Sequence, residues 1–318
     1  MDIKLDKKDW KILYELCENS RISRNLLAKK LGMNKNTVEY RIERLLKISF
    51  IKRFFVSINS EVLGYINFNL LIKLKRESQE FKDYLVNSPF TLVVEPFIGE
   101  WHFLADITVK DIRDLYGLIA NLKEKFSEII DSYELHPTLY SIKLEQIPFE
   151  IEGIEKPKAI DFKQSKKVDC DEKDFSILKE LSNDATISYI DLGKKLDMTY
   201  ETVSLRIKRM LNEGIIKKFS SLISLHLIGY DFYFVIVSLR HLSKSRETDF
   251  TNYIRSSSNI RYAFVSASEQ KVFMYYVSKG TIGLNDFLRD MNDKFYDIVF
   301  SQTFLVSSGL YKYKLFPD

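Results

Sequence analysis

An internal repeat is the feature that most constrains how this chain can fold. Residues 9–65 align without a gap with residues 174–230, at an offset of about 165 residues, and about two positions in five are identical. DWKILYEL corresponds to DFSILKEL, NTVEYRIERLL to ETVSLRIKRML, and VLGY to LIGY. The match is looser downstream, where residues 125–126 and 294–295 are both KF. The 318-residue chain is therefore one unit of about 150 residues, present twice.

Composition indicates an ordinary globular protein of two or more domains. Hydrophobic residues make up 45% and charged residues 29%, while the 11 Gly and 6 Pro suit regular elements with short loops. Two cysteines, Cys17 and Cys170, cannot form a disulfide framework, which fits a reducing compartment. The N-terminus lacks the apolar core of a signal peptide, and the most apolar run, residues 68–74, is far shorter than the roughly 20 residues of a membrane span. We expect a cytoplasmic protein without membrane contact.

Each unit begins with signals for three helices. Asp6 is placed to cap the first helix, and Ser23 to cap a short second helix that Gly32 ends. Asn34 caps the third helix, residues 34–46. The stripe of this third helix that we predict to be buried consists of apolar side chains at i, i+4, i+7 and i+8, namely Val38, Ile42, Leu45 and Leu46.

The order of these helices is typical of a helix-turn-helix. The pattern consists of a short helix, a tight turn and a third helix with polar and basic residues at its N-terminal end. In a complex with DNA this end would point at base edges. Residues 51–55 follow as a hairpin-like segment, and we expect its Lys52-Arg53 pair to lie on a wing beside the DNA backbone. The candidate DNA-binding residues are caps, polar-face residues and nearby cations: Asn34, Lys35, Asn36, Thr37, Glu39, Tyr40, Arg41, Arg44, Lys52 and Arg53 in the first copy, and Thr199, Tyr200, Thr202, Ser204, Arg206, Arg209, Lys217 and Lys218 in the second.

An amphipathic helix with a solvated charged face is the plainer alternative. The wing at the expected spacing favours the DNA-binding interpretation, as does the pattern of differences between the copies. Lys35 corresponds to Tyr200, whereas Arg41 and Arg206 match, as expected of a common scaffold with altered base-contacting positions. Random drift of exposed residues would produce a similar pattern. Residues 1–65 carry about six more cations than anions and residues 166–230 are close to neutral, so the first copy should bind DNA more strongly.

The rest of each unit alternates between strand-like and helix-like patterns. In the first copy we predict strands at 68–75, 92–98, 101–109, 129–135 and 139–147, with helices at 79–86 and 112–126. The second copy repeats the pattern over residues 232–306. The fold class is therefore α+β, with two copies of a winged helix-turn-helix followed by a ferredoxin-like βαββαβ domain. The predicted domains are 1–64 (winged helix), 65–149 (ferredoxin-like), 150–168 (linker), 169–229 (winged helix) and 230–318 (ferredoxin-like).

These segments together resemble the Lrp/AsnC family of transcriptional regulators. The resemblance is carried by LDKKDWKIL, ISRNLLAKKLGM, NTVEYRIERL and FIKRF followed by VLGY, with their second-copy counterparts. It implies a winged helix that binds double-stranded DNA, joined to an effector and assembly domain whose sheets pack face to face. With two units in one chain we predict an intramolecular pseudo-dimer that recognises two different half-sites. A homodimer of pseudo-dimers is compatible with this prediction.

The effector turn departs from the family's pattern. Members that sense amino acids carry a Gly-x-x-Asp-Tyr turn between the second and third strands, whereas GEWHF occupies residues 99–103 here and residues 266–271 lack the glycine. The Asp that would hold an amino group is missing from both copies, so we do not expect an ordinary amino acid as effector. Gly99, Glu100 and His102 are the candidate effector-binding residues if a small molecule binds.

Catalysis has little support in the sequence. The four histidines, His102, His136, His226 and His241, lack metal-binding spacing, and no phosphate-binding loop or nucleophile motif occurs. We therefore predict no metal, no cofactor and no enzyme activity. Two alternatives stay open. Siroheme decarboxylases have the same fold with a His-Asn-Tyr stretch, which residues 94–97 and 261–264 replace here. The chain could also be a sensor or assembly protein whose winged helices contact only partners.

Overall fold

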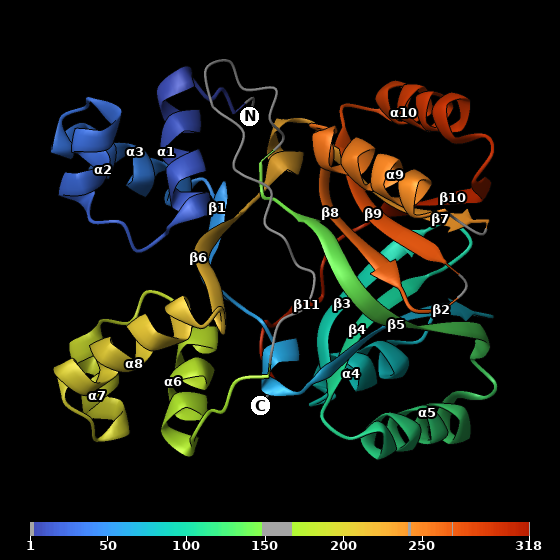
Figure 1. Cartoon of the computed structure of the whole chain (residues 1–318), viewed down its shortest axis with the longest axis horizontal. Helices are drawn as coiled ribbons and strands as arrows, with labels where there is room; N and C mark the ends of the chain where they lie inside the picture. The colour runs from blue at the N-terminus through green and yellow to red at the C-terminus, as the bar shows by residue number, and fades with distance from the viewer. Residues whose placement is uncertain (1–2, 148–166, 241–242, 269, 318) are drawn as a thin grey trace.

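The computed structural model describes residues 3–147, 167–240, 243–268 and 270–317. The predicted linker, residues 150–168, lies outside the described residues except for its last two. Figure 1 shows the two winged-helix regions on one side of the molecule and the strands of both ferredoxin-like regions on the other. Unit 1 denotes the described residues up to 147 and unit 2 those from 167 onward.

Capping side chains and a left-handed glycine mark helix ends in the two winged-helix regions. Asp6 accepts a hydrogen bond from the Asp9 N–H while the Asp9 carboxylate accepts one from the Asp6 N–H, a reciprocal capping box that Asp171 and Asp174 repeat. Gly32 ends the second helix in the left-handed conformation, as expected. The elements are α1 (Lys7–Glu18), α2 (Arg24–Leu31), α3 (Lys35–Lys47) and β1 (Ile51–Ile58), then α6 (Glu172–Asn183), α7 (Tyr189–Leu196), α8 (Tyr200–Asn212) and β6 (Ile216–Ile223).

The strand after each recognition helix does not form the expected hairpin. Strand β1 instead pairs in antiparallel fashion with β6 of the other unit, with Phe54 opposite Ser221 and Val56 opposite Phe219. The hairpin prediction is wrong because the partner strand is supplied by the second copy, not by the residues that follow. We call β1 and β6 together the inter-unit ribbon (Figure 1).

The inter-unit ribbon exchanges core residues between the two winged helices. Val56 and Ile58 of β1 pack in the hydrophobic cluster of α6–α8, which includes Ile177. Ile223 of β6 packs in the cluster of α1–α3, which includes Ile12. Each winged helix therefore completes its core with residues of a strand from the other.

Each unit continues into a βαββαβ region, as predicted. In addition, the 3-10 turns η1 (Glu61–Leu63) and η2 (Leu225–Ile228) lead into these regions, and β11 (Lys312–Tyr313) pairs with β3. Unit 1 contains β2 (Ile66–Leu74), α4 (Gln79–Asn87), β3 (Thr91–Ile98), β4 (Phe103–Val109), α5 (Ile112–Phe126) and β5 (Ile130–Leu144). Unit 2 contains β7 (Asp231–Leu239), α9 (Lys244–Ser256), β8 (Ile260–Ser266), β9 (Lys271–Ser278), α10 (Thr281–Phe295) and β10 (Val299–Ser307).

Strand β5 is continuous where the sequence predicts two strands. Its first half pairs with β2 as far as Pro137, and its second half pairs with β8 from Thr138 onward. A proline lacks the N–H of a ladder bond, so it fits where a strand changes partner. The Pro137 carbonyl still accepts a hydrogen bond from the Ala267 N–H of unit 2. The prediction of two strands is wrong because His136-Pro137 marks a change of partner, not a break.

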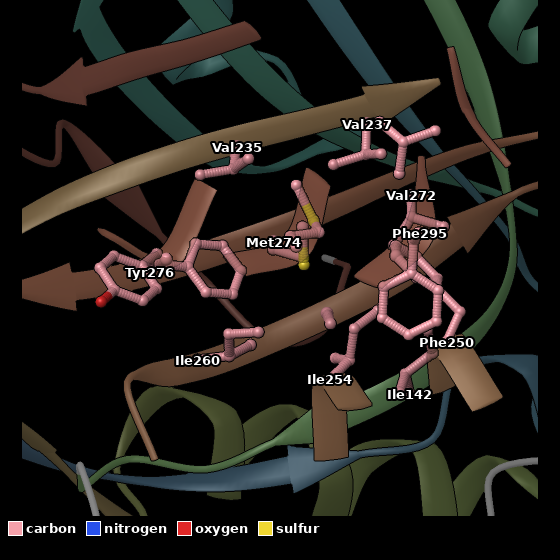
Figure 2. Packing of buried hydrophobic residues seen from close by; sticks show 14 of the residues in the cluster. Ile142, Val235, Val237, Phe250, Ile254, Ile260, Val272, Met274, Tyr276 and Phe295 are labelled. Atoms are coloured by element: carbon pink, nitrogen blue, oxygen red, sulfur yellow. The ribbon is translucent and has the colours of Figure 1, made fainter. Parts of the chain in front are cut away.

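The two sheets close on each other within the chain. The strand order is β10-β7-β9-β8-β5-β2-β4-β3, and β10 also pairs with β3, so the two four-stranded sheets join at both edges. Leu71 and Leu104 of unit 1 pack against Phe234 and Phe273 of unit 2 between the sheets. Helices cover the outer faces, and Figure 2 shows Phe250 gathered with the sheet residues over unit 2. This is the arrangement expected of an intramolecular pseudo-dimer.

Candidate nucleic-acid interface

The third helix of unit 1 presents a polar recognition face. Val38, Ile42 and Leu45 are buried, as predicted, whereas Leu46 is 39% exposed and the prediction for it is wrong. We define the recognition face of α3 as the outward side chains Lys35, Asn36, Glu39, Tyr40 and Glu43. Tyr40 lies at its centre and is 67% exposed. The Asn34 side chain caps the helix by accepting from the Asn36 N–H at 2.9 Å.

Two of the arginines predicted to bind DNA, Arg41 and Arg44, fasten α3 to α1. Arg41 Nη1 lies 2.7 Å from Asp9 Oδ1, and Arg44 Nη2 lies 2.5 Å from Asp9 Oδ2. Asp9 is only 1% exposed, so both guanidinium groups neutralise a buried carboxylate. Arg41 also contacts Asp6 at 2.9 Å. The pair therefore sets the orientation of the recognition helix.

Unit 2 repeats these ion pairs between the third helix and the first. Arg206 Nη1 and Arg209 Nη2 contact the two carboxylate oxygens of Asp174 at 2.8 and 2.5 Å. Thr199 caps α8 by accepting from the Thr202 N–H at 3.2 Å. The remaining candidates, Thr37, Thr202 and Ser204, are partly buried at the edges of the two helices, and Tyr200 is exposed.

The four cations predicted for the wings lie in different surroundings. Lys52 is exposed. Arg53 donates to the Tyr313 carbonyl and lies 4.8 Å from the centre of the Tyr313 ring. Lys218 pairs with Glu18 of unit 1 at 3.0 Å. Burial lowers the pKa of Lys217. Of these four, Lys52 is the one placed for contact with a phosphate.

Sequence reasoning missed the first turn of α2. Arg24 and the exposed Asn25 begin this helix beside the recognition face. Burial lowers the pKa of Arg24, while the neighbouring carboxylates of Glu39 and Glu43 raise it. The first helix of a helix-turn-helix crosses the DNA backbone, and helix N-termini attract phosphate. That general rule is the signal that could have found Arg24.

Direct contacts hold the two winged helices in one relative position. Arg21 of unit 1 donates to the Ile187 carbonyl of unit 2 at 2.8 Å. Its guanidinium also lies 4.9 Å from the Tyr189 ring centre and 4.6 Å from that of Phe219. The Ser20 N–H donates to the Phe219 carbonyl at 3.1 Å. Together with the inter-unit ribbon, these contacts fix how α3 and α8 are oriented relative to each other.

The candidate effector residues share the turn between β3 and β4. Gly99 has φ of 146°, and a Cβ there would lie 2.7 Å from Leu305 of unit 2, so a larger residue would strain the turn. Glu100 is exposed. His102 Nδ1 accepts from the Leu74 N–H at 2.8 Å, which leaves its other ring nitrogen for a ligand. Effector binding at this turn stays a prediction.

Two further findings concern the described part of the chain. Within it, no cluster of three or more His, Cys, Asp or Glu residues is arranged to hold a metal ion. Among its helices, none has the length and apolar character needed to cross a bilayer.

Paired recognition helices on two linked ferredoxin-like domains define a two-unit helix-turn-helix protein. A family model described as winged helix-turn-helix DNA-binding matches residues 5–52 and 171–217. An uncharacterised HTH-type transcriptional regulator of Pyrococcus furiosus is 30% identical over 138 residues, covering 43% of this chain and 92% of that protein. Another, from Pyrococcus horikoshii, is 37% identical over 67 residues, 21% of this chain, and the match spans 42% of that relative. The chain belongs to the family of HTH-type transcriptional regulators, and it carries the winged helix-turn-helix twice.

A solved structure shares the whole two-unit arrangement. The siroheme decarboxylase NirDL superposes with a TM-score of 0.65 at 12% identity, covering 96% of this chain and 92% of that one. At this identity the similarity describes the fold alone. The arrangement of four domains is thus found in an enzyme as well.

Proposed function

We propose that this chain is a sequence-specific regulator that binds double-stranded DNA through both winged helices, acting as an intramolecular pseudo-dimer. The observation that carries the proposal is the exposed recognition face of α3, which the buried Asp9 holds in place through Arg41 and Arg44. A polar face that is solvent-exposed yet rigidly anchored is suited to contact bases with defined geometry.

The recognition face offers groups that match base edges. Asn36 can form two hydrogen bonds with adenine, and Lys35 can donate to guanine. Glu39 and Glu43 can accept from the amino group of cytosine, although they repel phosphates. Arg24 and the exposed Lys52 lie where the backbone would pass on either side. The excess of cations in residues 1–65 supports stronger binding by unit 1 than by unit 2.

Selection of bound duplexes from a random pool, with the affinity measured at several salt concentrations, tests this proposal. We expect log affinity to fall linearly with log salt, because each neutralised phosphate releases counterions. A slope near zero would contradict DNA binding. Asymmetric selected sites would support two different half-sites, whereas a perfectly palindromic optimum would contradict them.

Paired variants separate binding to the DNA backbone from binding to the bases. Arg24→Ala with Lys52→Ala should weaken binding to all sequences and reduce the salt slope by about one for each phosphate that the variant no longer neutralises. Asn36→Ala should change sequence preference at one position, with a cost of about 1–3 kcal/mol there. Lys123→Ala, an exposed cation on α5, is the matched control and should change neither.

A siroheme-decarboxylase-like enzyme is the second candidate, favoured by the fold shared across 96% of the chain. At the positions of the His-Asn-Tyr stretch, the structure places Glu95 between the sheets and Arg261 beside Tyr262. Titration with iron-uroporphyrin tests this candidate. Binding with a shifted absorption band and turnover would favour the enzyme, whereas an unchanged spectrum would exclude it. A protein that neither converts iron-uroporphyrin nor binds DNA would be the sensor or assembly protein.

A further inference from the structure

The recognition helix of unit 2 has an apolar centre. Val203, Ile207 and Met210 form its buried stripe. Leu205 lies two residues from both Val203 and Ile207, about 200° around the helix axis, and therefore points away from the core. It is 71% exposed, although a leucine normally avoids water. Its place on α8 is that of Tyr40 on α3, the centre of the recognition face.

The surroundings of Leu205 also differ from those of Tyr40. Tyr200 and Glu201 stand where α3 has Lys35 and Asn36. Ile190, on the first turn of α7, is exposed and lines a shallow hollow together with Tyr200. We refer to these three exposed apolar side chains, Ile190, Tyr200 and Leu205, as the apolar strip.

The cations nearest this helix are either paired with Asp174 or exposed beside the strip. Arg206 and Arg209 are bound to Asp174, so they do not extend toward a base from the face of α8. Lys194, which lines the same hollow as Ile190 and Tyr200, and Lys208, three residues after Leu205 on α8, are both exposed. Exposed apolar side chains with ammonium groups beside them fit the major groove, where phosphates flank the base edges.

The major groove presents one apolar group, the 5-methyl of thymine. We propose that Leu205 determines the sequence preference of unit 2 by packing against thymine 5-methyl groups, with Tyr200 completing the apolar contact. This inference rests on the proposed DNA-binding function and names the chemistry of its second half-site. The two half-sites then differ in kind. Unit 1 recognises hydrogen-bonding groups through Asn36 and Lys35, and unit 2 recognises methyl groups.

Replacing thymine by deoxyuridine tests the inference, because this change removes the methyl and leaves base pairing intact. The full chain is titrated with a duplex selected by the wild-type protein, in which each thymine in turn is replaced. At one or two positions of one half-site we expect about a fourfold loss of affinity per methyl, corresponding to about 0.8 kcal/mol for one buried methyl group. Leu205→Ala should bind the thymine and deoxyuridine duplexes equally at those positions.

Matched variants locate the effect. Leu211→Ala changes an exposed leucine at the far end of the same helix and should keep the wild-type preference for thymine. Thermal unfolding of each variant checks that it folds.

The possible outcomes are distinct. A chain that binds no duplex contradicts the proposed function itself. A chain that binds DNA but responds to deoxyuridine nowhere overturns this inference alone, whatever the variants do. A response that Leu205→Ala leaves unchanged also overturns it, and the apolar strip would then be free to contact a protein partner.

Discussion

Glu95 is a carboxylate buried where the two sheets meet, and it should make stability depend on pH. It is 7% exposed and accepts hydrogen bonds from Tyr275, at 2.7 Å, and Ser307 of unit 2. Burial raises the pKa of Glu95 to about 7, although these two hydrogen bonds lower it, and neighbouring Asp106 raises it further. The folded pKa therefore lies above the unfolded value, so the folded state binds more protons between about pH 4.5 and 7. This group's contribution to stability falls as pH rises through that window.

Glu95→Gln stays neutral at every pH and should remove this dependence. Near pH 5 the variant and the wild type should be similarly stable. At pH 8 the variant should gain up to about 3 kcal/mol in the free energy of unfolding, because the wild type must then bury a charge. Urea unfolding at the two pH values measures the difference. Glu100→Gln, an exposed neighbour in the next turn, is the control and should show no gain. A variant less stable than the wild type at pH 8 would contradict the argument.

Single residues also show where sequence reasoning reached its limit. The helical spacing correctly placed Val38, Ile42 and Leu45 inside, because burial on one helix follows from its period. The same spacing left Arg41 and Arg44 beside a polar face and so suggested phosphate contacts. Their actual partner, Asp9, lies on a different helix, and no local pattern reveals such a pairing. The identity of these arginines in both copies suits a scaffold role equally well.

Among the elements, caps and helices were predictable and strand partners were not. A cap is an interaction over about three residues, so Asp6, Ser23 and Asn34 were assigned from sequence alone. The apolar pattern of β1 shows which side chains are buried but not which strand lies beside it. Its partner, β6, is more than a hundred and fifty residues away, which is about the repeat offset. A strand that pairs with its own copy is therefore mistaken for half of a hairpin.

Because β1 and β6 each pack against helices of the other unit, we predict that a mutation in one strand destabilises the winged helix of the other unit. Ile58 and Ile223 occupy equivalent positions, yet Ile58 packs with α6–α8 and Ile223 with α1–α3. Ile58→Ala should destabilise the second winged helix, and Ile223→Ala the first, each by about 2–5 kcal/mol. Amide hydrogen exchange of the two variants measures this, and each variant is the other's control. Faster exchange confined to the mutated residue's own unit would contradict the packing.

At the scale of the whole molecule, duplication within one chain frees the two halves to diverge. A homodimer must present the same recognition helix twice, whereas this chain carries Tyr40 in one helix and Leu205 in the other. The repeat and the family resemblance predicted the pairing of the sheets within the chain. They could not predict that Arg21 of the first winged helix contacts the second, because its contacts with Ile187 and Tyr189 depend on tertiary geometry. Those contacts hold the two linked winged helices in one relative position.

If both winged helices bind DNA as proposed, their fixed relative position should set the spacing between half-sites. Each base pair inserted between them moves one half-site by about 3.4 Å and rotates it by about 34°. The winged helices cannot follow, because Arg21, the Glu18–Lys218 ion pair and the inter-unit ribbon hold them. We expect one inserted base pair to weaken binding at least about tenfold, since one winged helix can then no longer reach its half-site. The same insertion outside the half-sites is the control and should have no effect.

Removing contacts between the two winged helices should make the protein tolerate an altered spacing between half-sites. Arg21→Ala with Lys218→Ala removes the cross-unit contacts of two side chains while leaving both recognition faces intact. We expect this double variant to lose less affinity than the wild type when a base pair is inserted, because its winged helices can adjust. Its affinity for the uninserted site should fall slightly, since it orders the two domains only on binding. Fluorescence anisotropy with the two duplexes gives all four affinities. An equal penalty in both proteins would show that the inter-unit ribbon alone sets the spacing, and a wild type that tolerates insertions would contradict the rigid pair.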